Sequence, residues 1–131
     1  MQMNTDNDRL VLDELTSAII ACVYNVSNIL GNGFLEKIYQ NALLVELSAA
    51  GLSARSQYPI IVHYKNTVVG EYFADILVNE HVILELKACN TLTPEHQAQC
   101  MNYLKATGLK VCLLINFGKS KVEIKRIVNH F

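Results

Sequence analysis

The sequence predicts an α/β domain, or α+β by a strict definition, with helices flanking a central mixed sheet. Two helical patterns open the chain, and a block of three strands follows them. A third helical pattern then lies between this block and a continuous apolar run at 111–117. A helix between two such strands is typical of a right-handed parallel crossover. Since a sheet of this kind buries both faces, we expect helices on both sides of it.

The first two elements are expected to be helices. Apolar residues recur at helical spacing at Leu12, Leu15, Ile19, Cys22 or Val23, Val26 and Leu30. Asp6, Asn7 and Asp8 favour the start of this helix, because such side chains cap helices and the two carboxylates interact well with the helix dipole. The cluster Gly31-Asn32-Gly33 ends it. A second helix is expected from Phe34 to Ala50, with Gly51 as its C-terminal glycine.

Three strands should follow as two hairpins. Apolar residues alternate before the polar triplet at 65–67, at Ile60, Val62 and Tyr64, and a second strand is expected over 68–78. A tight connection at 79–81 then leads into a third strand at 81–88. The two turns therefore predict an antiparallel arrangement of these strands.

The last third of the chain predicts a helix and two strands. Thr93, Pro94 and Glu95 are the cap, first-turn proline and favourable acid of a helix that Gly108 closes. The run at 111–117 is expected to be a strand buried on both faces. A more exposed final strand is expected around 122–128. No linker or repeat interrupts this order, so residues 1–131 are expected to form a single domain.

Composition narrows the class of protein. The chain has 131 residues, of which 51% are hydrophobic and 18% charged, as in a globular protein. We find no apolar run approaching the roughly 20 residues of a membrane span, and the polar start does not resemble a signal peptide. We therefore expect a cytoplasmic protein without a membrane partner. The four cysteines, Cys22, Cys89, Cys100 and Cys112, form no C-x-x-C pair and are expected to be buried thiols.

The net charge of −1 argues against binding of nucleic acid by bulk electrostatics alone. The C-terminal part is more basic, however. From residue 99 onward the chain has one acidic residue, Glu123. The basic residues of the same segment are Lys105, Lys110, Lys119, Lys121, Lys125 and Arg126. These residues indicate a local basic surface or, alternatively, an ordinary solvated face.

The strongest chemical signal is a set of charged residues inside an apolar segment. Asp75 precedes the triplet Glu85-Leu86-Lys87 by ten residues, and the neighbouring residues are those of buried strands. Isolated buried charge is unfavourable unless it is paired or binds a metal. Side chains alternate along a strand, so Glu85 and Lys87 share a face, and a hairpin at 79–81 would place Asp75 beside them.

This set suits metal-assisted phosphodiester hydrolysis. Asp75, Glu85 and the Leu86 carbonyl are candidate oxygen ligands for a divalent cation, and Mg²⁺ keeps further positions for water and phosphate. Mn²⁺ is expected to substitute. Lys87 would orient the nucleophile or stabilise the transition state. The alternative is a structural Glu85–Lys87 pair on a solvated strand face.

Two helices contribute further candidates. Glu36 and Tyr39 lie one turn apart on the second helix, and Gln99 and Tyr103 lie one turn apart on the third. For Glu36 the alternative is a first-turn acid favoured by the helix dipole, and for the tyrosines it is packing. His96 is expected to be a helix-start residue.

Together these residues resemble the G-x-x-E-x-x-Y proteins, a branch of the PD-(D/E)xK nuclease superfamily. Gly33, Glu36 and Tyr39 match the motif of that branch. The remaining residues match the superfamily's acid, its E-x-K triplet and a Q-x-x-x-Y helix motif known from RecB-like branches: Asp75, Glu85 with Lys87, and Gln99 with Tyr103. Ala74 replaces the proline of the P-D step. The resemblance covers residues 29–127.

The resemblance implies a restriction-endonuclease-like core of αβββαβ order, preceded here by an extra N-terminal helix. It implies that Glu36 joins Asp75 and Glu85 at the metal. It also implies that Gln99 and Tyr103 support the site or touch the nucleic-acid backbone, and we place Tyr39 in the same group. We expect a Mg²⁺-dependent nuclease acting on DNA rather than RNA, with a homodimer plausible. The alternatives are a nuclease-like binding or accessory module with little turnover, or a nuclease that acts on RNA.

Overall fold

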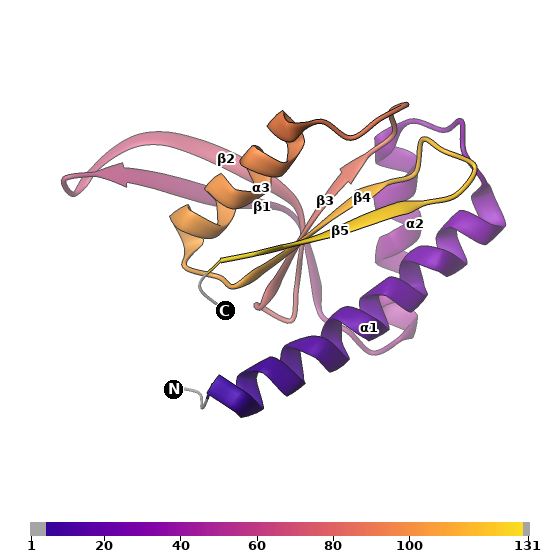
Figure 1. Ribbon diagram of the computed structural model, residues 1–131, viewed down its shortest axis with the longest axis horizontal. Coiled ribbons are helices and arrows are strands. Elements are labelled where there is room, and N and C mark those ends of the chain that lie inside the picture. Colours follow the sequence, from indigo (N-terminus) through magenta and orange to yellow (C-terminus); the bar gives the residue numbers. More distant parts are fainter. Residues whose placement is uncertain (1–4, 130–131) are drawn as a thin grey trace.

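The computed structural model describes residues 5–129 and shows three helices around one five-stranded sheet (Figure 1). The elements follow the predicted order. Helices are α1 (Thr5–Leu30), α2 (Glu36–Ala49) and α3 (Pro94–Thr107), and strands are β1 (Ala54–Tyr64), β2 (Thr67–Val78), β3 (Val82–Lys87), β4 (Val111–Asn116) and β5 (Glu123–Val128). The predicted fold class is confirmed. The backbone of residues 6 and 7 is part of α1, but the side chains of these two candidate caps are outside the part that the structure describes.

The sheet is mixed, with the strand order β1-β2-β3-β4-β5. Among the strands of residues 5–129, only β3 and β4 are parallel, from Val82 opposite Val111 to Lys87 opposite Asn116. The helix α3 makes the crossover between them, as the apolar run after the third helical pattern predicted. The other neighbours are antiparallel. The end of β3 that carries Glu85 and Lys87 therefore lies next to the end of β4.

Each face of the sheet has its own helical layer (Figure 1). The larger core packs α1 and α2 against one face, through residues such as Ile19, Leu43 and Leu113. The smaller core packs α3 against the other face, through Cys100, Leu104 and Leu114. Alternation along β3 sends Leu84 and Leu86 into the first core and Ile83 into the second. Glu85 and Lys87 alternate with Leu84 and Leu86 and so belong to the α3 face.

Local signals set the turns and helix ends. Lys65 and Asn66 both have positive φ, 49° and 64°, as a two-residue hairpin turn that matches the strand twist requires. Asn79 and Glu80 do the same at the second turn, with φ of 50° and 61°. Thr93 and His96 form a capping box at the start of α3, and Gly108 ends it in the left-handed conformation.

The first helix, α1, is long and apolar. By length and composition alone, Asp8–Leu30 is long and apolar enough to cross a membrane, which the search for apolar runs in the sequence missed. In the fold, however, its apolar stripe at Leu15, Ile19, Val23 and Val26 is buried in the larger core. This burial accounts for the stripe, whereas Leu10, Val11, Tyr24 and Ile29 of the same helix are exposed.

The cysteines differ in their exposure. All four cysteines are free, and Cys22, Cys100 and Cys112 are buried, but Cys89 is partly exposed. The prediction of four buried thiols is thus wrong for Cys89, which lies in the loop after β3 rather than in a strand or helix.

Only Ile76–Val78 of the long strand β2 pair with β3. The remaining part of β2, together with the part of β1 that pairs with it, projects from the sheet as a two-stranded arm (Figure 1).

Candidate functional site

Asp75 lies where β2 and β3 separate. Their last paired residues are Ile76 and Leu84, and beyond them the two strands no longer form a ladder. The Leu86 amide donates instead to Asp75 Oδ2, at 2.7 Å. The carboxylate therefore replaces the missing strand partner and fixes its own position. A backbone hydrogen bond to a carboxylate is a strong, charge-assisted one.

The backbone is distorted directly opposite Asp75. The β1–β2 register passes from Ser56–Ile76 to Tyr58–Ala74, so Gln57 faces Asp75 without a regular pair. Gln57 has a φ of 51°, which is uncommon for a residue other than glycine. Its Nε2 donates to Gln40 Oε1 at 3.0 Å, which ties β1 to α2 beside Asp75. Such strain clusters at functional sites.

Glu85 is almost completely buried, at 4% exposure. Its Oε2 accepts from the Tyr103 hydroxyl at 3.3 Å and lies 3.8 Å from Lys87 Nζ. Its Oε1 is buried and has no hydrogen-bond partner among the described residues. A buried carboxylate oxygen without a partner is costly, and this one is therefore a position at which a ligand would relieve the cost.

The electrostatics follow from this burial. Desolvation, followed by the negative charge of Asp75, raises the pKa of Glu85 to about 8, although the Lys87 ammonium acts in the opposite direction. Burial and the same two carboxylates also raise the pKa of Tyr103. The site thus holds two adjacent acids that cannot easily both be ionised. A divalent cation would remove that conflict.

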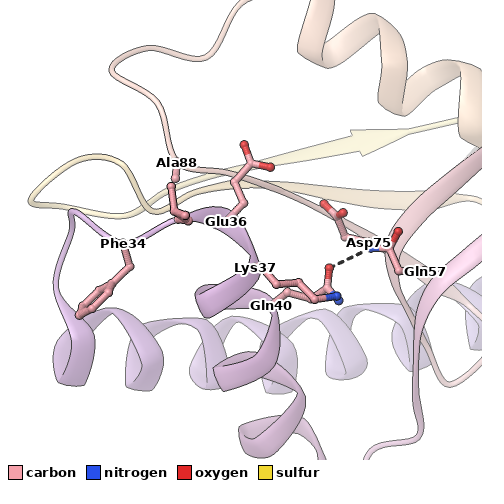
Figure 2. A pocket seen from close by; sticks show the side chains of 8 residues that line it. Phe34, Glu36, Lys37, Gln40, Gln57, Asp75 and Ala88 are labelled. Atoms are coloured by element: carbon pink, nitrogen blue, oxygen red, sulfur yellow. Dashed lines mark hydrogen bonds between the residues drawn. The ribbon is translucent and has the colours of Figure 1, made fainter.

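Glu36 reaches the same region from the start of α2. It lines a hollow of about 450 Å³ together with Phe34, Leu35, Lys37, Gln40, Gln57, Asp75 and Ala88. Figure 2 shows the Glu36 and Asp75 carboxylates on two sides of this hollow, one carried by α2 and one by β2. Glu36 is exposed, whereas Asp75 is partly buried.

The predicted three-acid cluster is not preassembled. Within residues 5–129, no three His, Cys, Asp or Glu side chains gather closely enough to hold a metal ion by themselves. Asp75 and Glu85 adjoin, and Glu36 faces Asp75 across the hollow without joining the pair. Mg²⁺ is commonly bound by only one or two carboxylates, with waters and substrate phosphates completing its octahedron. Together with the unpartnered Glu85 Oε1, the donors present fit such an ion.

The Leu86 carbonyl lies on the appropriate side of β3. The next carbonyl along, that of Lys87, accepts from the Phe117 amide on the β4 side. Because the backbone groups of successive residues in a strand point to opposite neighbours, the Leu86 carbonyl and amide face β2 and Asp75. This orientation supports the prediction of Leu86 as a backbone ligand, which stays a prediction.

Tyr39 supports the loop before α2 from within the larger core. It is fully buried and stacks on Phe117 at 4.5 Å between ring centroids. Its hydroxyl donates to the Gly31 carbonyl at 2.7 Å and accepts from the Phe34 amide at 3.2 Å. A fully buried ring contacts no substrate, so Tyr39 secures the loop that leads to Glu36. Of the two roles expected for Tyr39, support of the site or contact with nucleic acid, this position favours support, which stays a prediction.

The residues expected from α3 divide into two roles. Tyr103 contacts Glu85, as the Q-x-x-x-Y match implied. Gln99 lies one turn earlier on the same helix and is partly exposed, and its role stays a prediction. His96 accepts from the Thr93 amide through Nδ1, at 3.1 Å, which confirms the helix-start role expected for it.

The sequence reasoning missed Gln40 and Asn116. Gln40 is 4% exposed, and its Nε2 has no partner among the described residues although it lies beside the hollow. Asn116 is fully buried: its Oδ1 accepts from the Cys89 and Gly118 amides, and its Nδ2 donates to the Cys89 carbonyl. Each is a polar residue at a position where the pattern of its helix or strand calls for an apolar one. This departure from the pattern could have identified them in the sequence.

A close backbone approach holds the segment after Lys87. Cβ of an alanine at position 118 would overlap the Cys89 backbone nitrogen and oxygen. Gly118→Ala should therefore lower the free energy of unfolding by about 1–3 kcal/mol, as overpacking typically does. Urea denaturation measures the change. Gly70→Ala is the matched control, because Cβ there meets nothing within 4 Å. Equal stability of the two variants would contradict this packing.

Comparisons with known proteins agree with this geometry. The family model of the PD-(D/E)XK nuclease superfamily matches residues 13–127. Among solved structures, one described as the crystal structure of SSO0001 superposes with a TM-score of 0.59 at 18% sequence identity. The match covers 91% of this chain and 60% of that one. At this identity the likeness concerns the fold. No curated protein sequence matches the chain.

The family match spans every element from within α1 to β5, including the fork between β2 and β3 where Asp75, Glu85 and Lys87 meet. The chain belongs to the PD-(D/E)XK nuclease superfamily.

Proposed function

We propose that this protein is a metal-dependent nuclease that hydrolyses phosphodiester bonds, with DNA as its substrate. The observation that carries the proposal is the arrangement at the fork: Glu85 adjoins Asp75, keeps one buried oxygen without a partner and lies 3.8 Å from Lys87 Nζ. Two acids and an amine at the fork between β2 and β3 suit hydrolysis of an anionic ester.

Asp75, Glu85 and the Leu86 carbonyl would hold Mg²⁺, or Mn²⁺ in its place, and Glu36 would contribute from across the hollow. Bound there, the cation would supply Lewis acidity toward the phosphate and acidify a water molecule. The protein fixes two of these ligands in advance. Asp75 is anchored by the Leu86 amide, and Tyr103 anchors Glu85 through its hydroxyl.

Lys87 would stabilise the negative charge that develops on the phosphate. Its side chain is only 21% exposed, so its charge acts in a medium of lower dielectric than bulk water. Lys37 and Gln40 line the hollow between Glu36 and Asp75. Their nitrogen atoms, including the unpartnered Gln40 Nε2, would donate to non-bridging phosphate oxygens. These groups are in place before a substrate arrives, which is what electrostatic catalysis requires.

The finer assignments belong to the same proposal. Gly33, Glu36 and Tyr39 support membership of the G-x-x-E-x-x-Y branch. We propose a single domain over residues 1–131, a cytoplasmic location and a homodimer in which a second copy serves the other strand of a duplex. A second candidate is a binding module with little turnover, which the exposed cations Lys105, Lys110 and Lys125 favour.

A cleavage assay separates these candidates. The protein is incubated with single-stranded, duplex and branched DNA and with RNA, each with Mg²⁺, Mn²⁺ or a chelator. We expect cleavage of DNA with either metal and none with the chelator. Binding without metal and without cleavage on all substrates would overturn the nuclease in favour of the binding module. Cleavage of RNA alone would correct the substrate.

A further inference from the structure

A second hollow lies between the projecting β1–β2 arm and α3, on the face of the sheet that carries Glu85. Its volume is about 500 Å³, in the range typical of small-ligand sites. The arm contributes one wall and the helix the other. The lining includes Ile61, Val62, His63 and Tyr72 from the arm, and Asn102 and Lys105 from α3.

Tyr72 connects this hollow to the candidate active site. Its ring contacts the ring of Tyr103, with centroids 5.5 Å apart and planes inclined by 59°. The Tyr103 hydroxyl in turn donates to Glu85. Tyr72 nevertheless stays 41% exposed. The ring is thus supported from behind by a buried aromatic residue and open toward the hollow.

The chemistry of the lining suits an unpaired nucleobase. Aromatic and aliphatic side chains offer a flat apolar surface on which a base can stack. Asn102 offers both a donor and an acceptor for the edge of a base. Lys105 and His63 offer contacts to the adjoining phosphate, and none of the residues that line the hollow is acidic. This charge pattern fits the polyanion, and the aromatic platform favours a base over an acidic protein surface.

We propose that this hollow binds one unpaired base of a single-stranded substrate segment, with Tyr72 as the stacking platform and Lys105 at its phosphate. The inference rests on the proposed nuclease function and deepens it, because it requires a single-stranded or unstacked segment next to the scissile bond. Tyr72 is then a binding residue, and it takes no part in the chemical step.

Phe73 offers a matched control on the same strand. Tyr72 pairs with Ile60, which is buried under α3, whereas Phe73 pairs with Pro59 and points to the opposite face of the arm. Phe73 is 50% exposed, so an alanine there removes a similar exposed ring. Only the Tyr72 ring contacts Tyr103.

The test measures binding with the metal-free full chain, so that it does not depend on cleavage. A single-stranded oligonucleotide is titrated into the wild type, Tyr72→Ala and Phe73→Ala. Stacking of one base is worth about 1–3 kcal/mol, so Tyr72→Ala should weaken binding about 5- to 150-fold. Phe73→Ala should bind like the wild type.

The same oligonucleotide with a single abasic position, moved along its length, locates the base. At one position the abasic substitution should weaken binding to the wild type but not to Tyr72→Ala, since the stacking partner is already missing. Lys105→Ala should instead reduce the dependence of binding on salt, because that lysine contacts phosphate. Lost binding without such a position-dependent coupling would overturn the proposal.

Failure here is distinguishable from failure of the proposed nuclease. If Tyr72→Ala binds single strands like the wild type while the protein still cleaves in the presence of Mg²⁺, the nuclease stands and the base site is wrong. If Phe73→Ala and Tyr72→Ala weaken binding equally, the arm acts through general apolar contact, and the hollow is not the site.

Discussion

Replacing Lys87 with alanine is expected to slow phosphodiester cleavage about 100- to 1,000-fold, the usual effect of removing one preorganised charge-stabilising group. The expected loss is in kcat, because the ammonium acts on charge that appears in the transition state. Metal binding should persist, since Lys87 is a positive group beside the carboxylates and not a ligand. Single-turnover cleavage and calorimetric titration with Mn²⁺ measure the two effects separately.

Lys110→Ala is the matched control, because it removes the same charge from an exposed loop residue. It should cleave at nearly the wild-type rate. Lys87→Ala should also fold normally at neutral pH: without the ammonium, Glu85 takes up a proton more readily and stays neutral. A Lys87→Ala protein that cleaves within a few-fold of the wild type would remove this residue from the mechanism.

The stability of the metal-free protein is expected to fall by roughly 3 kcal/mol as the pH rises from about 5 to 8. Burial and Asp75 raise the pKa of Glu85 to about 8, above its ordinary value of 4.5. Between those two values the folded protein holds a proton that the unfolded chain has lost. The unfolding free energy is therefore greatest below the unfolded pKa and decreases as the pH passes through the folded one.

Urea denaturation in the presence of a chelator, at several pH values, measures this decrease. Glu85→Gln is the control, because it keeps the shape of the side chain and removes the titration. The three described histidines, His63, His81 and His96, are common to both proteins, so the difference between the two profiles isolates Glu85. Parallel profiles for wild type and Glu85→Gln would show that the carboxyl group is not buried as described.

Asp75 combines a structural and a chemical role that the sequence did not separate. Its carboxylate both faces the hollow and accepts from the Leu86 amide. An alanine at this position would leave that amide without its partner, so removing the acid is not simply a relief of repulsion between acids. An asparagine oxygen would keep the hydrogen bond and lose only the charge.

Local chemistry determined the order of the elements. The polar pair Lys65 and Asn66 made the hairpin turn, in which Asn66 is of a type that tolerates positive φ, and Thr93 with Pro94 began α3. Alternation along β3 was sufficient to put Glu85 and Lys87 on one face. Such features depend on residues close in the chain, and a sequence displays them directly.

Only the tertiary structure decided what surrounds those residues. The raised pKa of Glu85 requires burial under α3 and a neighbour from β2, and the sequence gives neither distance. Gln40 and Gln57 are 17 positions apart and meet only because a distorted β1 comes against α2. Tyr39 matched a family motif, and the fold shows that its ring packs on Phe117, the residue that follows β4. Contacts between distant segments form only when the chain has folded, so they fix burial, charge and hydrogen bonding at the site.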